Sequence, residues 1–317
     1  MIKSKENYKI YKNGNYYVGI NLDTGTKFQY LPESLEHEGY KPEFAESVDM
    51  QITNKCSIGC PFCYADAKSN NEHPDLKKYE KLFDSFHPYT EIAINGNDFD
   101  HPDLDWFLKK MKEKKVIVNV TFHFLQFINA FESIKKYKDE GYIKGIGISF
   151  NNDIAMFVHK YIMNPIDIPP VRSFIKTNKD IVAHIIAGKF EKGILLANIV
   201  CLGIKKLLVL GNKNKGRNKD TEYDIMDTKR VLYNYKRFFD VIAYDTLAIN
   251  QLHLKDDMTE EEYDLHYLGN DGTSSFYIDL CTGTYNISSS SNKEPYVIKD
   301  NESVDFMFKQ IRTNMKY

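Results

Sequence analysis

Three of the five cysteines in this 317-residue chain lie within eight consecutive positions. Cys56, Cys60 and Cys63 are separated by three and two residues, and Gly59 allows the loop between them backbone conformations closed to other residues. Thiolates at this spacing can converge from one loop, and thiolates are the ligands of iron–sulfur clusters and zinc. Three ligands leave one metal position open, as a reactive site requires. The odd cysteine count argues against a disulfide scaffold and favours a cytosolic metal or redox site.

A zinc site is the alternative interpretation of the same cysteines. It needs a fourth ligand, for which the sequence offers His73, Cys201 or Cys281. Zinc ribbons pair two Cys-x2-Cys units, and the sequence contains no second unit. The spacing therefore favours an iron–sulfur cluster over zinc. A non-catalytic iron–sulfur or zinc-binding protein stays open as an alternative of another class.

At these cysteines, with Phe62 before the last of them, the sequence resembles the radical S-adenosylmethionine (SAM) superfamily. The resemblance implies that the cysteines ligate three irons of one [4Fe–4S] cluster, and that SAM chelates the fourth iron. It further implies a cytoplasmic, oxygen-sensitive enzyme. An electron from a donor such as flavodoxin or ferredoxin would cleave SAM to methionine and a 5′-deoxyadenosyl radical, which abstracts hydrogen from a substrate. A looser likeness, in 43–76 and 271–279, is to small radical SAM proteins of phages and bacteria, and it implies no substrate.

Strand-like and helix-like segments alternate between residues 47 and 250, which predicts βαβ units and a parallel sheet. The expected fold is α/β, a partial (β/α)6-type TIM barrel with the cysteines at the carboxyl end of its first strand. Strands are expected at 47–53, 91–95, 115–122, 145–150, 180–187, 206–211 and 241–247. Helices are expected at 75–86, 102–113, 124–140, 153–163, 191–202 and 224–239.

Two short extensions flank the predicted barrel. Residues 1–46 are expected to form a β-hairpin or meander around the turn Asn13-Gly14-Asn15. Residues 251–317 are expected to cover the barrel with a hairpin around Cys281 and a closing helix at 304–314. Both extensions are too short to form an enzyme domain of their own.

The resemblance also implies where SAM would bind. Family members carry a Gly-Gly-Glu-Pro-like turn after the second strand, which binds the amino group of SAM; this sequence has Asn95-Gly96-Asn97-Asp98 there and keeps one glycine. Polar residues on later strands would meet SAM or the substrate, although His184 is as easily explained as a core histidine. The cofactor-binding candidates are Phe62, Tyr64, Asn95, Gly96, Asn97, Asp98, Asn119, Ser149, His184, Leu210 and Gly211.

Three features at the barrel mouth bear on the substrate. Asp245 is a candidate to orient it, and Cys281 is a candidate hydrogen donor or a buried packing residue. Residues 212–219 carry four cations, Lys213, Lys215, Arg217 and Lys219, and predict either a basic lid that clamps an anion or a solvated loop. Cys201 lies in an apolar helix and is expected to pack.

Composition narrows the class of substrate. Lysine and arginine number 42 against 44 acids, a net charge of −2, which excludes a general nucleic-acid or membrane-surface binder. No signal segment or membrane-spanning stretch is expected.

Two remaining cysteines cannot supply an auxiliary cluster, so one cluster is predicted. The expected substrate is a peptide or protein side chain; the alternative is a nucleotide or small metabolite, suggested by the basic loop.

Overall fold

The computed structural model describes residues 7–23, 25, 27–95, 97, 99–151, 158, 169–189, 193–219, 225–267 and 269–314. The helix predicted at 153–163 lies outside these residues, apart from Val158. Among the described helices, none combines the length and hydrophobicity that crossing a bilayer demands.

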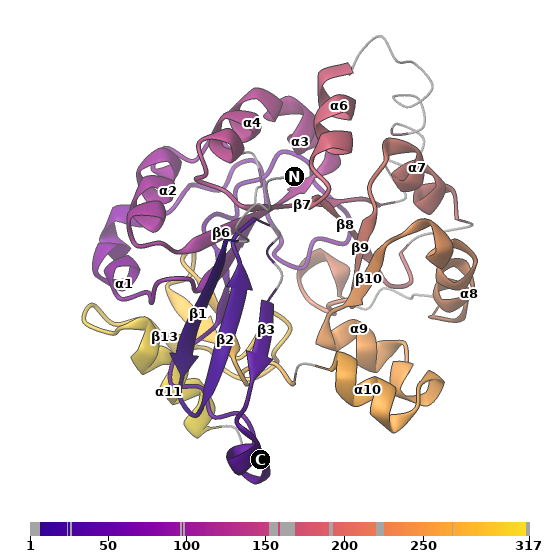
Figure 1. Ribbon diagram of the computed structural model, residues 1–317. Helices are drawn as coiled ribbons and strands as arrows, with labels where there is room; N and C mark the ends of the chain where they lie inside the picture. The colour runs from indigo at the N-terminus through magenta and orange to yellow at the C-terminus, as the bar shows by residue number, and fades with distance from the viewer. Residues whose placement is uncertain are drawn as a thin grey trace, which may run out of the picture.

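A curved, mostly parallel sheet forms the body of the protein, with helices along its outer side (Figure 1). Its order is β10-β9-β8-β7-β6-β5-β4-β11-β12-β13, so β10 and β13 are the edges and the barrel stays open. The strands β4 (Ser47–Gln51), β5 (Glu91–Asn95), β6 (Ile117–His123), β7 (Gly145–Ser149), β8 (Val182–Ile186), β9 (Lys206–Leu210) and β10 (Val241–Tyr244) are parallel neighbours. This confirms the predicted α/β class; in the described part of the chain there are seven parallel strands from β4 to β10, where a six-unit barrel was expected.

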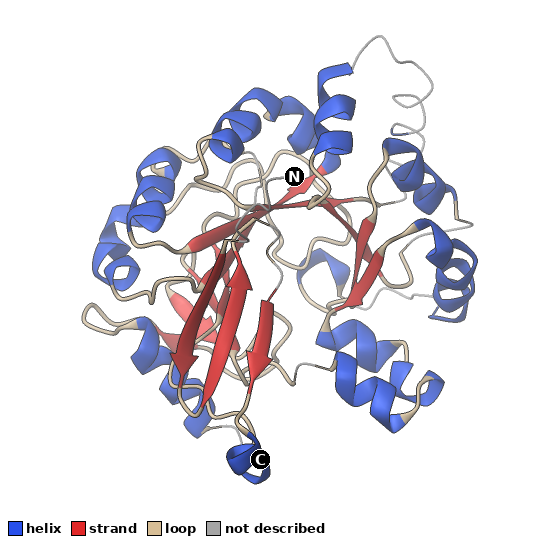
Figure 2. Cartoon of the chain, in the orientation of Figure 1, coloured by secondary structure: helices blue, strands red, loops and turns tan. Residues whose placement is uncertain are grey.

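The helices lie between or after these strands (Figure 2). They are η2 (Leu76–Tyr79), α1 (Glu80–Asp84), α2 (Leu104–Glu113), α3 (Phe124–Asn129), α4 (Phe131–Asp139), α6 (Pro169–Thr177), α7 (Ile194–Leu202), α8 (Ile225–Tyr235), α9 (Thr246–Gln251), α10 (Glu260–His266) and α11 (Val304–Thr313). In α2 the residues Leu104, Phe107, Leu108 and Met111 recur at helical spacing, and all four are buried against the sheet.

Several element boundaries differ from the prediction. The helix expected at 124–140 is divided at Ala130, because α3 is a separate turn capped by His123 and Gln126. The short helices α6, α9 and α10 were not predicted. In α9 and α10 the first turn is held by a side-chain cap, from Asp245 and Thr259, and such short helices carry too little periodicity to detect.

The first strand of the C-terminal hairpin joins the barrel sheet. β11 (Ser275–Asp279) pairs in parallel with β4, and β12 (Thr284–Asn286) and β13 (Tyr296–Val297) follow antiparallel. The expected hairpin is therefore present, but its first strand extends the barrel wall. This placement brings residues 275–279 beside the strand that leads into the cysteines.

The N-terminal extension is a separate antiparallel sheet of β1 (Tyr8–Asn13), β2 (Tyr16–Asn21) and β3 (Lys27–Tyr30) (Figure 1). A cavity of about 540 Å³ lies between the end of β2 and the amino ends of β5 to β9. Lys27 pairs with Glu91 at the start of β5, at 2.5 Å. The predicted hairpin thus closes the end of the barrel opposite the cysteines.

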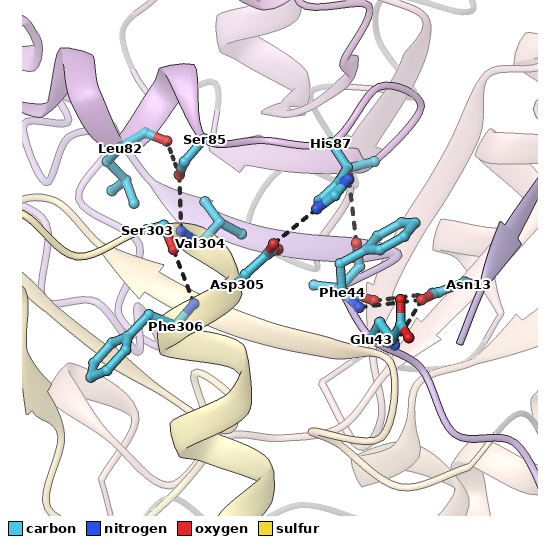
Figure 3. A network of polar contacts seen from close by, with 12 residues as sticks. Asn13, Glu43, Phe44, Leu82, Ser85, His87, Ser303, Val304, Asp305 and Phe306 are labelled. Carbon is cyan, nitrogen blue, oxygen red and sulfur yellow. Dashed lines mark hydrogen bonds and ion pairs between the residues drawn. The ribbon is translucent and has the colours of Figure 1, made fainter. Parts of the chain in front are cut away.

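Polar contacts join the start of α11 to Ser85 and His87, which follow α1 (Figure 3). Ser303 caps the helix by accepting from the Phe306 N–H, and Ser85 accepts from the Val304 N–H at 2.9 Å. His87 contacts the Asp305 carboxylate at 2.9 Å. The C-terminal helix predicted at 304–314 is confirmed, and it is anchored beside α1.

Candidate active site

The loop that carries the three cysteines closes on itself. Cys56 N–H donates to the Lys68 carbonyl and Lys68 N–H donates to the Asn54 carbonyl, both at 3.0 Å. Gly59 has φ +69°, the left-handed conformation that the sequence predicted for it. The loop, residues 54–68, is therefore a folded unit that begins and ends at the same point of the barrel.

The cysteines lie around one cavity of about 500 Å³ at the carboxyl ends of the parallel strands. None of the three forms a disulfide, and all three are partly buried. The predicted site residues that line this cavity are Cys56, Cys60, Cys63, Phe62, Tyr64, Asn95, Asn97, Ser149, His184, Leu210, Gly211 and Asp245. The predicted Gly96 and Asp98 lie outside the described residues.

Three predicted residues lie elsewhere. Asn119 lines the other cavity, and its Oδ1 accepts from the Gly145 N–H at 2.8 Å. Cys281 is absent from the described lining of the cysteine cavity and lies behind Gln51, whose Nε2 is 4.0 Å from its sulfur. Burial raises the pKa of Cys281 to about 12, so the sulfur stays a thiol at neutral pH. Cys201 is exposed, and the expectation that it packs is wrong.

Hydrogen bonds join the turn after β5 to the residues that precede the cysteine loop. Asn95 accepts from the Ile52 N–H at 3.1 Å and donates to the Thr53 carbonyl at 2.7 Å, and Asn97 donates to the same carbonyl at 3.1 Å. Both functional ends of the Asn95 amide are thus used within the protein.

Asp245 has a structural partner on each side. Its Oδ1 accepts from the Gly211 N–H at 2.9 Å and caps α9 by accepting from the Ala248 N–H at 2.7 Å. Burial raises the pKa of this carboxyl, and the two N–H groups oppose that rise. Asp245 therefore shapes the cavity wall by holding the Gly211 turn against α9.

Two uncharged histidines line the cavity. Burial lowers the pKa of His123 and of His184 to about 4, so both imidazoles are neutral at physiological pH. His184 lies in the barrel interior and lines both cavities. Gly147 makes room for it, since a Cβ there would meet the His184 ring at 2.6 Å.

Three of the four cations in the basic loop bind the protein itself, which neither the predicted lid nor the predicted solvated loop included. Arg217 donates to the Cys60 carbonyl at 2.9 Å, to the Ala67 carbonyl at 3.0 Å and to the Asp66 carboxylate at 2.9 Å. Lys213 and Lys215 bind within the segment 289–291. The loop clamps the cysteine loop instead of an external anion.

The loop also approaches the cysteines through its backbone. Arg217 N–H donates to the Cys63 carbonyl at 3.0 Å. Gly216 has φ +57°, and a Cβ there would lie 2.5 Å from the Tyr64 carbonyl oxygen. Only glycine fits at this position. A glycine beside an arginine in a basic segment was the one sequence signal for this contact.

Gln126 is a site residue that the sequence reasoning missed. Its Nε2 donates to the Cys56 sulfur at 3.4 Å, and its Oε1 accepts from the His123 N–H at 3.3 Å. The side chain is buried, so the cap fixes its amide with the N–H side toward the sulfur. Gln126 follows His123 by three positions, a capping pattern that could have indicated the helix cap. It could not have indicated the hydrogen bond to the Cys56 sulfur.

Asp49 and Tyr277 also lie on the cavity wall and were missed by the sequence reasoning; Lys213 of the basic loop lies there with them. The Tyr277 hydroxyl donates to Gln51 Oε1 at 2.9 Å. The Lys213 amine donates to Ser289 Oγ at 2.6 Å and lies 4.1 Å from the centre of the Tyr64 ring. Burial raises the pKa of the Asp49 carboxyl above its usual range. For Asp49 and Tyr277 the sequence offered only one signal, the alternation of each with apolar neighbours along its strand.

Within the described residues, no three His, Cys, Asp or Glu side chains are grouped to hold a single metal ion. The three cysteines lie on one folded loop around one cavity.

No protein-family model and no curated protein matches the sequence. Solved structures do match. SuiB of Streptococcus suis bound to the precursor peptide SuiA has a TM-score of 0.64 at 14% identity, over 97% of this chain and 88% of that chain. SuiB bound to S-adenosylmethionine has a TM-score of 0.62 at 14% identity, over 92% and 85%. The protein therefore has the fold of SuiB, from its N-terminal sheet to its C-terminal helix.

Proposed function

We propose that the protein is a radical SAM enzyme with one [4Fe–4S] cluster on Cys56, Cys60 and Cys63. The observation that carries the proposal is the placement of these three cysteines around one cavity at the carboxyl ends of a parallel, open barrel. Catalytic sites of barrel enzymes lie at that end. When bound there, the cluster and SAM supply a 5′-deoxyadenosyl radical that abstracts a hydrogen atom from the substrate.

The chain's own residues position the cofactors and keep water out. Phe62, Ile186, Leu208 and Leu210 give the cavity an apolar lining, which suits reactive intermediates. Ser149 lines the cavity at the end of β7 and offers a hydroxyl to SAM. The partner in electron transfer is a low-potential donor such as flavodoxin or ferredoxin.

The proposed substrate is a peptide or protein side chain. The support is the similarity of fold to SuiB, which has been crystallised with its precursor peptide. The alternative of a nucleotide or small metabolite was drawn from the basic loop, whose cations bind the protein itself. The peptide is therefore the better supported class.

Anaerobic reconstitution tests the proposed function. The protein should bind about four irons and four sulfides per chain. After reduction with dithionite, added SAM should yield methionine and 5′-deoxyadenosine in equal amounts. Stoichiometric zinc in a protein that resists reconstitution, or a stable cluster that leaves SAM intact, would refute the proposal.

Gln126 is predicted to raise the reduction potential of the bound cluster. Its N–H on the Cys56 sulfur stabilises the added negative charge of the reduced state. Gln126→Leu removes the donor without adding charge, and Gln126→Glu keeps the acceptor for the His123 N–H while losing the donor. Both variants should show a more negative midpoint potential in a redox titration followed by electron paramagnetic resonance.

The matched control for this prediction is Gln310→Glu, on α11 away from the cavity, which should leave the potential unchanged. If Gln126→Leu has the potential of the wild type, the hydrogen bond does not tune the cluster, and Gln126 serves only as a helix cap.

A further inference from the structure

The carboxylate of Asp49 is open to the cavity that the cysteines line. Asp49 lies in the middle of β4, in register with Ala93 on β5 and Tyr277 on β11. The small Ala93 side chain leaves space beside the carboxylate. Among the described residues, none forms a hydrogen bond or ion pair with the Asp49 side chain, which lines the cavity and is exposed there.

The charges around Asp49 leave the cavity negative. Asp245 and Asp271 raise the pKa of its carboxyl further, and only Lys213 opposes them. Lys213 is itself held by Ser289 and by the Tyr64 ring, so its amine is not placed on the Asp49 carboxylate. Of the described residues on the cavity wall, Asp49 and Asp245 are acidic and Lys213 is basic, and this excess of carboxylate favours the entry of a cation.

The wall beside Asp49 suits the stem of a long basic side chain. The Tyr277 hydroxyl is fixed on Gln51, which leaves the ring as an aromatic surface next to the carboxylate. Aromatic faces attract cations and pack against methylene groups. The carboxylate and the ring together recognise a cationic group on an apolar stem.

We propose that Asp49 binds a basic group of the substrate, an ammonium or a guanidinium, in the cavity lined by the three cysteines. The inference rests on the proposed function only in taking this cavity as the reaction site. It narrows the substrate to one that presents a lysine-like or arginine-like group. SAM also carries an ammonium, and the experiment must separate these two sources.

The test uses two blocked amino acids as probes, Nα-acetyl-lysine methylamide and Nα-acetyl-norleucine methylamide. Neither has a charged backbone group, and only the lysine probe carries an ammonium on its side chain. Their binding to reconstituted protein saturated with SAM, without reductant, is measured by ligand-observed NMR. Wild-type protein should bind the lysine probe about tenfold more tightly, since a hydrogen bond to a charged group is worth about 1.5–3 kcal/mol. Asp49→Asn, which is nearly isosteric, should bind both probes equally. The control Asp256→Asn, at an exposed position, should keep the preference.

Two results would overturn the inference. In one, wild-type protein binds the two probes equally. In the other, Asp49→Asn weakens binding of labelled SAM in equilibrium dialysis while the preference for lysine persists, which assigns the carboxylate to SAM. Failure of the proposed function has a different signature, because wild-type protein then does not bind iron or does not cleave SAM, and the probe preference is measured on protein without cluster and SAM.

Discussion

Alanine at Cys56, Cys60 or Cys63 is expected to abolish the iron–sulfur cluster, and with it every SAM-derived product. Each thiolate would hold a different iron, so none of the three can replace another. After anaerobic reconstitution, wild-type protein should contain about four irons per chain and absorb as a brown solution. Each variant should contain far less iron and should lack the brown absorbance. Iron and sulfide analysis with the visible spectrum measures this directly.

The chain supplies the controls for this experiment. Cys201 is exposed on α7, and Cys281 lies behind Gln51 outside the described cavity lining. Alanine at either position should leave iron content unchanged. If Cys281→Ala lost the cluster as fully as Cys56→Ala, the set of ligands would be wrong. If it kept the cluster and 5′-deoxyadenosine but changed the final product, Cys281 would be the hydrogen donor that the sequence suggested.

Arg217→Met is expected to impair cluster assembly although Arg217 is not a ligand. The substitution removes donors to the Cys60 and Ala67 carbonyls and to the Asp66 carboxylate, while keeping much of the side-chain volume. Because Asp66 is partly exposed, we expect the free energy of unfolding to fall by only about 2 kcal/mol. The cysteine loop loses its support, so iron content should fall below half of the wild-type value.

Lys219→Met is the matched control, since Lys219 is exposed on the same loop. This variant should bind as much iron as the wild type. Gly216→Ala gives an independent test, because its Cβ would meet the Tyr64 carbonyl in a left-handed conformation and push the two loops apart. Full iron loading in both Arg217→Met and Gly216→Ala would show that the clamp is dispensable. Melting temperatures of all variants separate loss of the cluster from loss of the fold.

Much of the barrel was predictable because its strands are local patterns. The strand β5 at Glu91–Asn95 has the predicted bounds, and β7 and β9 differ from the prediction by one residue at one end. Short buried strands followed by amphipathic helices produce two periodicities that alternate along the chain. The place of β11 was not predictable, since a hairpin sequence does not state which sheet edge it will join.

The sequence by itself determined which residues are proposed as metal ligands, because Cys56, Cys60 and Cys63 share one short loop and their spacing is local. Only the tertiary structure decided what surrounds them. Gln126 reaches Cys56 across 70 positions, and Arg217 reaches the Cys60 carbonyl across 157. Such contacts depend on strand order and register, which bring the carboxyl ends of distant strands to one edge of the barrel. For the same reason Asp49 is one of the alternating polar residues of a strand in the sequence, and an open carboxylate in the folded protein.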